Sequence, residues 1–118
     1  MIAALHAQAP STAETDWVRI ATLYRELLTA SPSPVVALNH AVAVAMSEGP
    51  GAGLALVDGI DGLDHYHLLH AARADLLRRL DRRDEAAAAY RRAHELATDP
   101  ADRRFLAGRL LSLDTEST

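Results

Sequence analysis

The chain has 118 residues, the length of one domain with a single modest hydrophobic core. Ala and Leu dominate its composition while only five residues are aromatic, which favours closely packed helices over a β-sandwich. Its net charge of −4, with 12 basic residues that are all Arg, does not favour nucleic-acid binding, because phosphate neutralisation needs an excess of basic charge on one face. The absence of cysteine excludes disulfides, thiolate metal sites and a cysteine nucleophile.

Two segments bear on localisation. Residues 1–9 lack the basic start of a signal peptide. The longest apolar run, residues 35–46, is too short to span a bilayer and is interrupted by Asn39 and His40. We therefore expect a cytoplasmic protein that makes no membrane contact.

The N-terminal third predicts one short helical segment and one complete helix. Residues 1–9 have helical composition and end at Pro10, and Ser11 with Glu14 has capping-box spacing. The helix that follows should end before Pro32. Its predicted buried face consists of Trp17, Ile20, Leu23, Tyr24, Leu27 and Leu28.

A second helix start is marked by Ser33 and Pro34, because the serine hydroxyl can cap the helix and proline is tolerated at its first position. The predicted helix, roughly residues 34–47, is apolar nearly all round, which is typical of a central helix. Glycine and proline at 49–51 should end it, and a short helix is predicted over residues 52–58.

Residues 65–100 predict two helices hinged at Asp81, Arg82 and Arg83. Their apolar residues recur at three- and four-residue steps and define the buried faces: Leu69, Ala72, Leu76, Leu77 and Leu80, then Ala86, Ala89, Tyr90, Ala93 and Leu96. Asp99 and Pro100 start a last helix that should cover the end of the stack through Phe105, Leu106, Leu110 and Leu113. We predict one domain over residues 1–113 and a frayed tail over residues 114–118.

The spacing of small and aromatic residues in this hairpin resembles the second half of a tetratricopeptide (TPR) repeat: Ala74, Leu77, Ala86, Tyr90 and Ala93. Tyr24 followed by Pro32 echoes Tyr90 followed by Pro100, with the prolines 68 residues apart, twice a 34-residue period. These patterns predict an all-α fold, a TPR-like stack of antiparallel helix pairs (an α-α superhelix) with a C-terminal capping helix. The helix around Tyr24 also fits the first-helix pattern of such a repeat. We favour the second-helix position, because residues 32–58 then form a helix pair of their own.

A more specific resemblance covers residues 1 to about 113. The run from Ser31 through Asn39 and His40, the segment ending at Asp58, and above all HAARADLL at residues 70–77 resemble the C-terminal TPR-like extension of extracytoplasmic-function (ECF) RNA polymerase sigma factors. The promoter-melting and promoter-recognition domains of a sigma factor are absent from the sequence. The resemblance implies a role in transcription initiation through contacts with sigma-factor DNA-binding domains or RNA polymerase, and it does not imply promoter binding by this segment.

Five polar residues set within apolar helices are the candidate partner-binding residues: Asn39, His40, His70, Arg73 and Asp75. They need partners if buried, so they form either a structural network between repeats or a contact surface on the concave face lined by the first helices. Arg73 breaks the apolar repeat pattern with a planar five-donor group. Because residues two apart do not face each other on a helix, its partner must come from another helix or another protein rather than from Asp75.

The histidines and the arginine doublets each have two interpretations. His67 and His70 share a helix face with Asp64, which makes a weak divalent site conceivable, but histidines that pack or cap are favoured and no metal is expected. The doublets, among them Arg78-Arg79, lie among Asp and Glu residues. They predict a solvated helix surface with short ion pairs, with an arginine-lined patch for an acidic partner as the alternative.

No pattern in the chain points to catalysis. There is no Gly-x-Ser-x-Gly nucleophile turn and no phosphate-binding glycine loop, so we expect a protein that is not an enzyme and has no cofactor. Three functions remain: the sigma-factor interaction domain, a free-standing TPR-like adaptor that binds a peptide segment, and a binder of a metal or small ligand at the histidines. An adaptor of the carboxylate-clamp kind is disfavoured, because the chain has no Lys and Asn39 is its one Asn.

Overall fold

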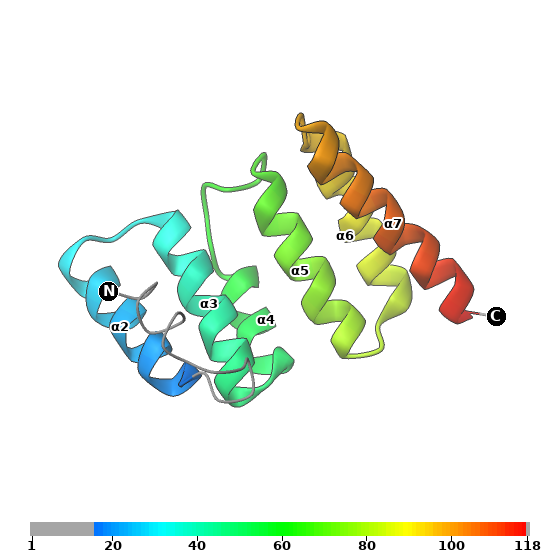
Figure 1. Cartoon of the computed structure of the whole chain (residues 1–118). Coiled ribbons are helices and arrows are strands. Elements are labelled where there is room, and N and C mark those ends of the chain that lie inside the picture. Colours follow the sequence, from blue (N-terminus) through cyan, green and yellow to red (C-terminus); the bar gives the residue numbers. More distant parts are fainter. Residues whose placement is uncertain (1–15, 118) are drawn as a thin grey trace.

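The computed structural model describes residues 16–117 of the chain. Within this range the chain folds into helices and contains no strand, which confirms the predicted all-α stack (Figure 1). The helices are α2 (Trp17–Ala30), α3 (Pro34–Glu48), α4 (Pro50–Asp58), α5 (His67–Arg79), α6 (Arg83–Leu96) and α7 (Pro100–Ser117).

Consecutive helices pack against one another along the stack. The most extensive packing joins α5 to α6 and α3 to α4, so each of these is a helix pair, while α2 packs on α3 and α7 packs on α6. Figure 1 shows α3, α5 and α7 on the near side of the molecule and α4 and α6 behind them. The register in which the helix around Tyr24 is the second helix of a pair stays a prediction, because its first helix would lie outside the described residues.

The starts of α2 and α3 are set by side-chain caps. The Asp16 carboxylate accepts a hydrogen bond of 3.1 Å from the Arg19 amide, so α2 begins at Trp17. The predicted capping box at residues 11–14, like the helical segment predicted over residues 1–9, lies outside the described residues. At α3 the prediction is confirmed, since the Ser33 hydroxyl accepts from the Val36 amide at 3.5 Å.

Glycine permits the tight connection between α3 and α4. Gly49 ends α3 with φ 109°, a conformation that strains residues with a side chain. Four residues later Gly53 lies against α3 so closely that an added Cβ would come within 2.4 Å of the Ala45 Cβ and 2.8 Å of the Ala41 carbonyl oxygen. The short helix α4 therefore packs on α3 at backbone distance, and the absence of a side chain at residue 53 makes this possible.

The turn between α5 and α6 is a Schellman motif, a common way for a helix to end. The Arg82 amide donates to the Leu77 carbonyl at 2.9 Å and the Asp81 amide donates to the Arg78 carbonyl at 3.0 Å. Asp81 takes the left-handed conformation with φ 61° that glycine usually occupies here. The predicted joint at Asp81 is thus confirmed.

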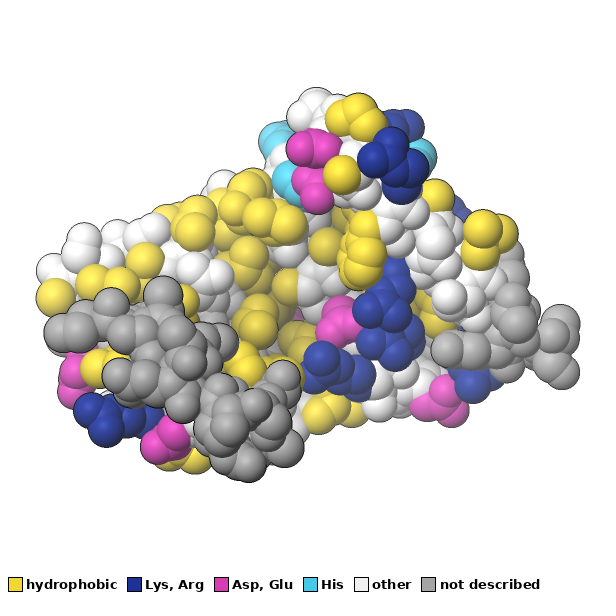
Figure 2. Space-filling model, viewed as in Figure 1, with side chains coloured by type: hydrophobic (Ala, Val, Ile, Leu, Met, Phe, Trp, Pro, Cys, Tyr) yellow, Lys and Arg dark blue, Asp and Glu magenta, His cyan; other side chains and the backbone are white. Residues whose placement is uncertain are grey.

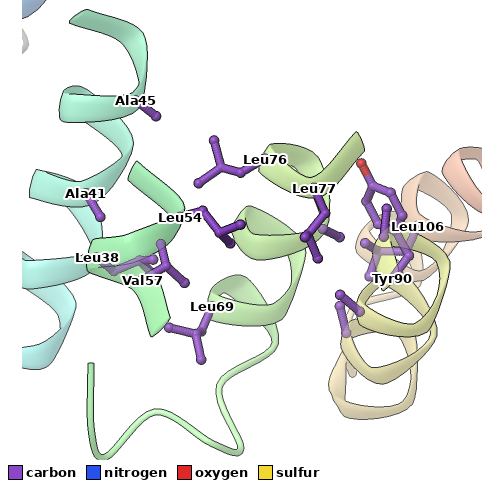
Figure 3. Close-up of a cluster of buried hydrophobic side chains, with 14 of the residues drawn as sticks. Leu38, Ala41, Ala45, Leu54, Val57, Leu69, Leu76, Leu77, Tyr90 and Leu106 are labelled. Atoms are coloured by element: carbon purple, nitrogen blue, oxygen red, sulfur yellow. The ribbon is translucent and has the colours of Figure 1, made fainter. Parts of the chain in front are cut away.

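The main hydrophobic core runs through the stack from α3 to α7. Figure 3 shows its inward-pointing side chains, and the ring of Tyr90, which is 1% exposed, meets Leu77 of α5 and Leu106 of α7. The small residues Ala86, Ala89 and Ala93, all buried, let α6 approach its neighbours. A second, smaller cluster joins α2 to α3: Ile20, Ala21, Ala43 and Val44.

Three sequence-based expectations are corrected. Leu27 was expected in the core but is 43% exposed, because α2 packs on α3 through Ile20 and Ala21. Phe105 was expected to cover the end of the stack but is 57% exposed, since α7 uses Leu106 and Leu113 for that contact. The backbone of α7 continues in helical form to Ser117, past the boundary predicted at residue 113.

No helix within residues 16–117 has the length and apolar character needed to cross a membrane.

Candidate protein interface

Arg73 finds its partner on another helix. Its Nε donates to Asp58 Oδ1 at 2.8 Å, which ties the middle of α5 to the last residue of α4. A second pair lies beside it, where the Arg82 guanidinium donates to both carboxylate oxygens of Glu85 at 2.9 and 2.6 Å. The Arg82 hydrogen bond, and to a smaller degree Arg73, lowers the pKa of Glu85. These four residues, the Arg73 cluster, place charges from α4, α5 and α6 side by side.

Asp75 is engaged within its own helix. Its carboxylate accepts a hydrogen bond of 2.7 Å from Arg78 and lies 3.2 Å from Arg79 Nη2, at the three- and four-residue spacings that place side chains together on a helix. Arg79 also donates to the Met46 sulfur of α3 at 3.2 Å. Asp75 therefore belongs to a charged strip on α5 that borders α3.

Asn39 is exposed and lies on the same side of α3 as this strip. Val35, Asn39, Val42 and Met46 follow one another at three- and four-residue steps, so they share one face of α3, and the valines are among the exposed large hydrophobic residues. Figure 2 shows this side of the molecule, with hydrophobic side chains gathered over α3 and mixed charges over α5. Asn39 and Asp75 thus border a shared, partly apolar surface.

His40 points to the opposite side of α3, toward α2. It is half-buried, and its ring lines a cavity of ≈ 280 Å³ together with Arg25, Val44 and Glu48. Burial lowers the pKa of His40, the Arg25 charge lowers it further, and Glu48 opposes this effect. Because the pKa lies below its ordinary value of 6.5, the imidazole is neutral at neutral pH.

The remaining histidines are held separately. His70 Nε2 lies 2.8 Å from the Asp64 carbonyl oxygen and donates to it in the matching tautomer, while His67 Nε2 lies 3.3 Å from Asp102 Oδ2 and joins α5 to α7. The side chains of His67 and His70, considered from sequence as neighbours on one helix face, therefore have separate partners. Among the described residues no group of three His, Asp or Glu side chains is placed to hold a metal ion.

The structure does not bring the five candidate residues to one place. Asn39 and Asp75 border the surface between α3 and α5, Arg73 faces α4 and α6, His40 faces α2, and His70 bonds the loop before α5. Of these residues, Arg73 makes the contact between helix pairs that the structural-network interpretation requires, whereas Asp75 pairs within α5 and His70 bonds the loop before it. The doublets behave as predicted for a solvated helix surface, with short-range pairs such as Arg82 to Glu85 and Arg92 to Glu95.

One feature of the surface was not predicted. A cavity of ≈ 520 Å³ opens beside His40, where α2, α3 and α4 come together. A smaller cavity of ≈ 190 Å³ lies between α5 and α7, with the exposed Leu68 and Phe105 on its walls. Neither has a motif in the sequence, because each arises from how the helices are spaced in the fold.

The helix stack places the protein among all-α helical-repeat folds, and comparison with known proteins adds one relative. Over 116 residues the chain is 44% identical to an uncharacterized protein of Rhizobium meliloti (strain 1021). The alignment covers 98% of this chain and 27% of the relative, so the chain spans about a quarter of the length of the protein that it matches. No protein-family model matches the chain. No solved structure matches it either.

Proposed function

We propose that the chain is a non-catalytic interaction domain of an ECF-type RNA polymerase sigma factor. In this function it works in the cytoplasm and contributes to transcription initiation by contacting the sigma-factor DNA-binding domains or the polymerase. The observation that carries the proposal is the alignment of nearly the whole helix stack with one quarter of a longer relative. A stack of this kind that recurs as one part of a longer chain fits a module that serves other domains.

The sigma-factor part of the proposal comes from the sequence resemblance. The HAARADLL segment at residues 70–77 forms the first part of α5, where Ala74, Leu76 and Leu77 pack in the core and Arg73 and Asp75 make their ion pairs. These five residues of the segment therefore either pack in the core or form an ion pair. A shared segment of this kind supports a shared fold with the sigma-factor extension, and through it a shared function.

A free-standing adaptor is the second candidate. The ≈ 520 Å³ cavity, largely apolar and open to solvent, favours binding of a peptide segment, and such binding serves an adaptor as well as a sigma-factor domain. The coding sequence that flanks this chain distinguishes the two. Sigma-like DNA-binding domains encoded upstream in the same reading frame are expected. A flanking region that encodes an unrelated domain would contradict the sigma-factor proposal and leave the adaptor.

A further inference from the structure

The cavity beside His40 is a groove between α2 and α4. Its walls come from the end of α2 with the loop after it and from α4 with the loop after it, and the N-terminal half of α3 forms the floor. Its apolar lining includes Leu28, Pro32, Pro34, Ala37, Leu56 and Ile60. At ≈ 520 Å³ it lies within the range of about 300–1,000 Å³ typical of ligand pockets. We call it the α2/α4 groove.

The next position along the stack carries ion pairs on its surface. Between α4 and α6, over α5, the Arg73 cluster brings the Arg73–Asp58 and Arg82–Glu85 pairs together. The α2/α4 groove has no ion pair of this kind among the described residues, and Leu56 on its wall remains 40% exposed. Charged side chains therefore pair at the surface at one position, and apolar side chains line the other.

The charge at the groove is negative. Asp61, in the loop after α4, lines the groove and forms no ion pair with any residue that the structure describes. His40 on the floor is neutral at neutral pH, because burial and then Arg25 lower its pKa. Arg25 itself lines the ≈ 280 Å³ cavity on the α2 side of His40, together with Glu48. An apolar floor beside one unpaired carboxylate suits a ligand that is apolar and carries a positive charge.

We propose that the α2/α4 groove binds a peptide segment of a partner protein that places an apolar side chain against Leu56 and an arginine or lysine beside Asp61. The assignment of that segment to the DNA-binding part of a sigma factor rests on the proposed function. Domains that bind DNA are rich in Lys and Arg, because these side chains neutralise phosphates. Such domains therefore carry positive charge that can pair with the Asp61 carboxylate. The groove itself requires only the apolar and basic side chains.

The test uses fluorescein-labelled peptides of about twelve residues and the whole chain. One peptide contains leucine and arginine spaced by serine, a second replaces each arginine by glutamate, and a third replaces each leucine by serine. Fluorescence polarisation should show that the leucine–arginine peptide binds at least about tenfold tighter than either of the others. Equal binding of all three, or no binding of any below about 1 mM, would overturn the proposal.

Variants locate the binding. Leu56→Ser should weaken binding of the leucine–arginine peptide about tenfold, while Leu68→Ser, which alters a leucine of similar exposure on α5, should leave it unchanged. Asp61→Asn should weaken binding about two- to fivefold, with Glu26→Gln on α2 as the matched control. Thermal melts establish that each variant is folded. Equal effects of Leu56→Ser and Leu68→Ser would place the peptide elsewhere and contradict the assignment.

The outcomes separate this inference from the proposed function. Peptide binding that depends on Leu56, without any binding of sigma-factor domains or polymerase, would retain the groove and remove the sigma-factor assignment. Binding of sigma-factor domains that is unaffected by Leu56→Ser would retain the proposed function and overturn the groove as its contact site.

Discussion

The guanidinium of Arg73 on α5 lies 2.8 Å from the Asp58 carboxylate at the end of α4. The basic residue that breaks the apolar repeat pattern of α5 is thereby explained by a contact inside the fold. The same pair lies next to Arg82 and Glu85, so that charges from α4, α5 and α6 lie side by side at the surface. We therefore propose the α2/α4 groove, rather than Arg73, as the contact surface for a partner.

We expect Arg73 and Asp58 to be coupled in stability. Both side chains are partly exposed, so solvent screens the pair, and a coupling free energy of about 0.2–1 kcal/mol is expected. Urea denaturation of Arg73→Ala, Asp58→Ala and the double variant measures it. Additive effects of the two single substitutions would show that the pair contributes nothing in solution.

Replacing Asp81 by glycine should stabilise the protein. Asp81 holds φ 61° in the turn after α5, and glycine takes this conformation without the steric cost of a side chain, so Asp81→Gly should raise the free energy of unfolding by about 1 kcal/mol. The lost ion pair to Arg83 is exposed and offsets little of this. Chemical denaturation gives the result, and an Asp81→Gly protein less stable than the parent would contradict the Schellman geometry.

Two glycines should respond in opposite directions to the same substitution. Gly53→Ala forces a methyl group into the Ala45 side chain and the Ala41 carbonyl, so a loss of about 1–3 kcal/mol is expected. Gly108 in α7 has nothing within 4 Å of the position of an added Cβ, and Gly108→Ala should stabilise by about 0.5–1 kcal/mol. Thermal melts of both variants measure this. A neutral Gly53→Ala would mean that α3 and α4 are farther apart than described.

The ring of Tyr90, rather than its hydroxyl, should carry the stability at that position. Tyr90→Ala removes a buried ring from the junction of α5, α6 and α7 and should cost about 3–5 kcal/mol. The buried hydroxyl has no hydrogen-bond partner among the described residues. Asp75, and to a smaller degree the Tyr90 hydroxyl, raises the pKa of Arg78. Tyr90→Phe should therefore change stability by less than about 1 kcal/mol. In urea denaturation, a loss from Tyr90→Ala below that value would refute the burial of the ring.

Local sequence signals were sufficient for the presence of the helices and for some of their ends. Ser33 and Pro34 fix the start of α3 through a hydroxyl cap and a missing amide, interactions between residues close in the chain. The joint at Asp81 followed from the change of periodicity on either side of it. Burial of Tyr90 followed from its spacing to small residues that face the same way along α6. These features depend on neighbours within about one helical turn.

The direction of single polar and aromatic side chains was harder to predict. Phe105 lies at the edge of the apolar stripe of α7, and the Arg109 guanidinium, 5.1 Å from its ring centroid, partly covers it in place of another helix. The partner of Arg73 depends on how α4 is placed against α5. The α2/α4 groove depends on the gap between two helices that are not consecutive in the chain. The Arg73 partner and the groove are not encoded within a single helical turn.

The most direct measurement is a calorimetric titration of the 118-residue chain with the DNA-binding domains of an ECF sigma factor and, separately, with core RNA polymerase. We expect one of them to bind with a dissociation constant of about 10 µM or tighter, with about tenfold weaker binding for Leu56→Ser and no change for Leu68→Ser. Duplex DNA is the control and should not bind at physiological salt, because the chain is acidic. Absence of binding to both protein partners, or binding to DNA alone, would contradict the proposed function.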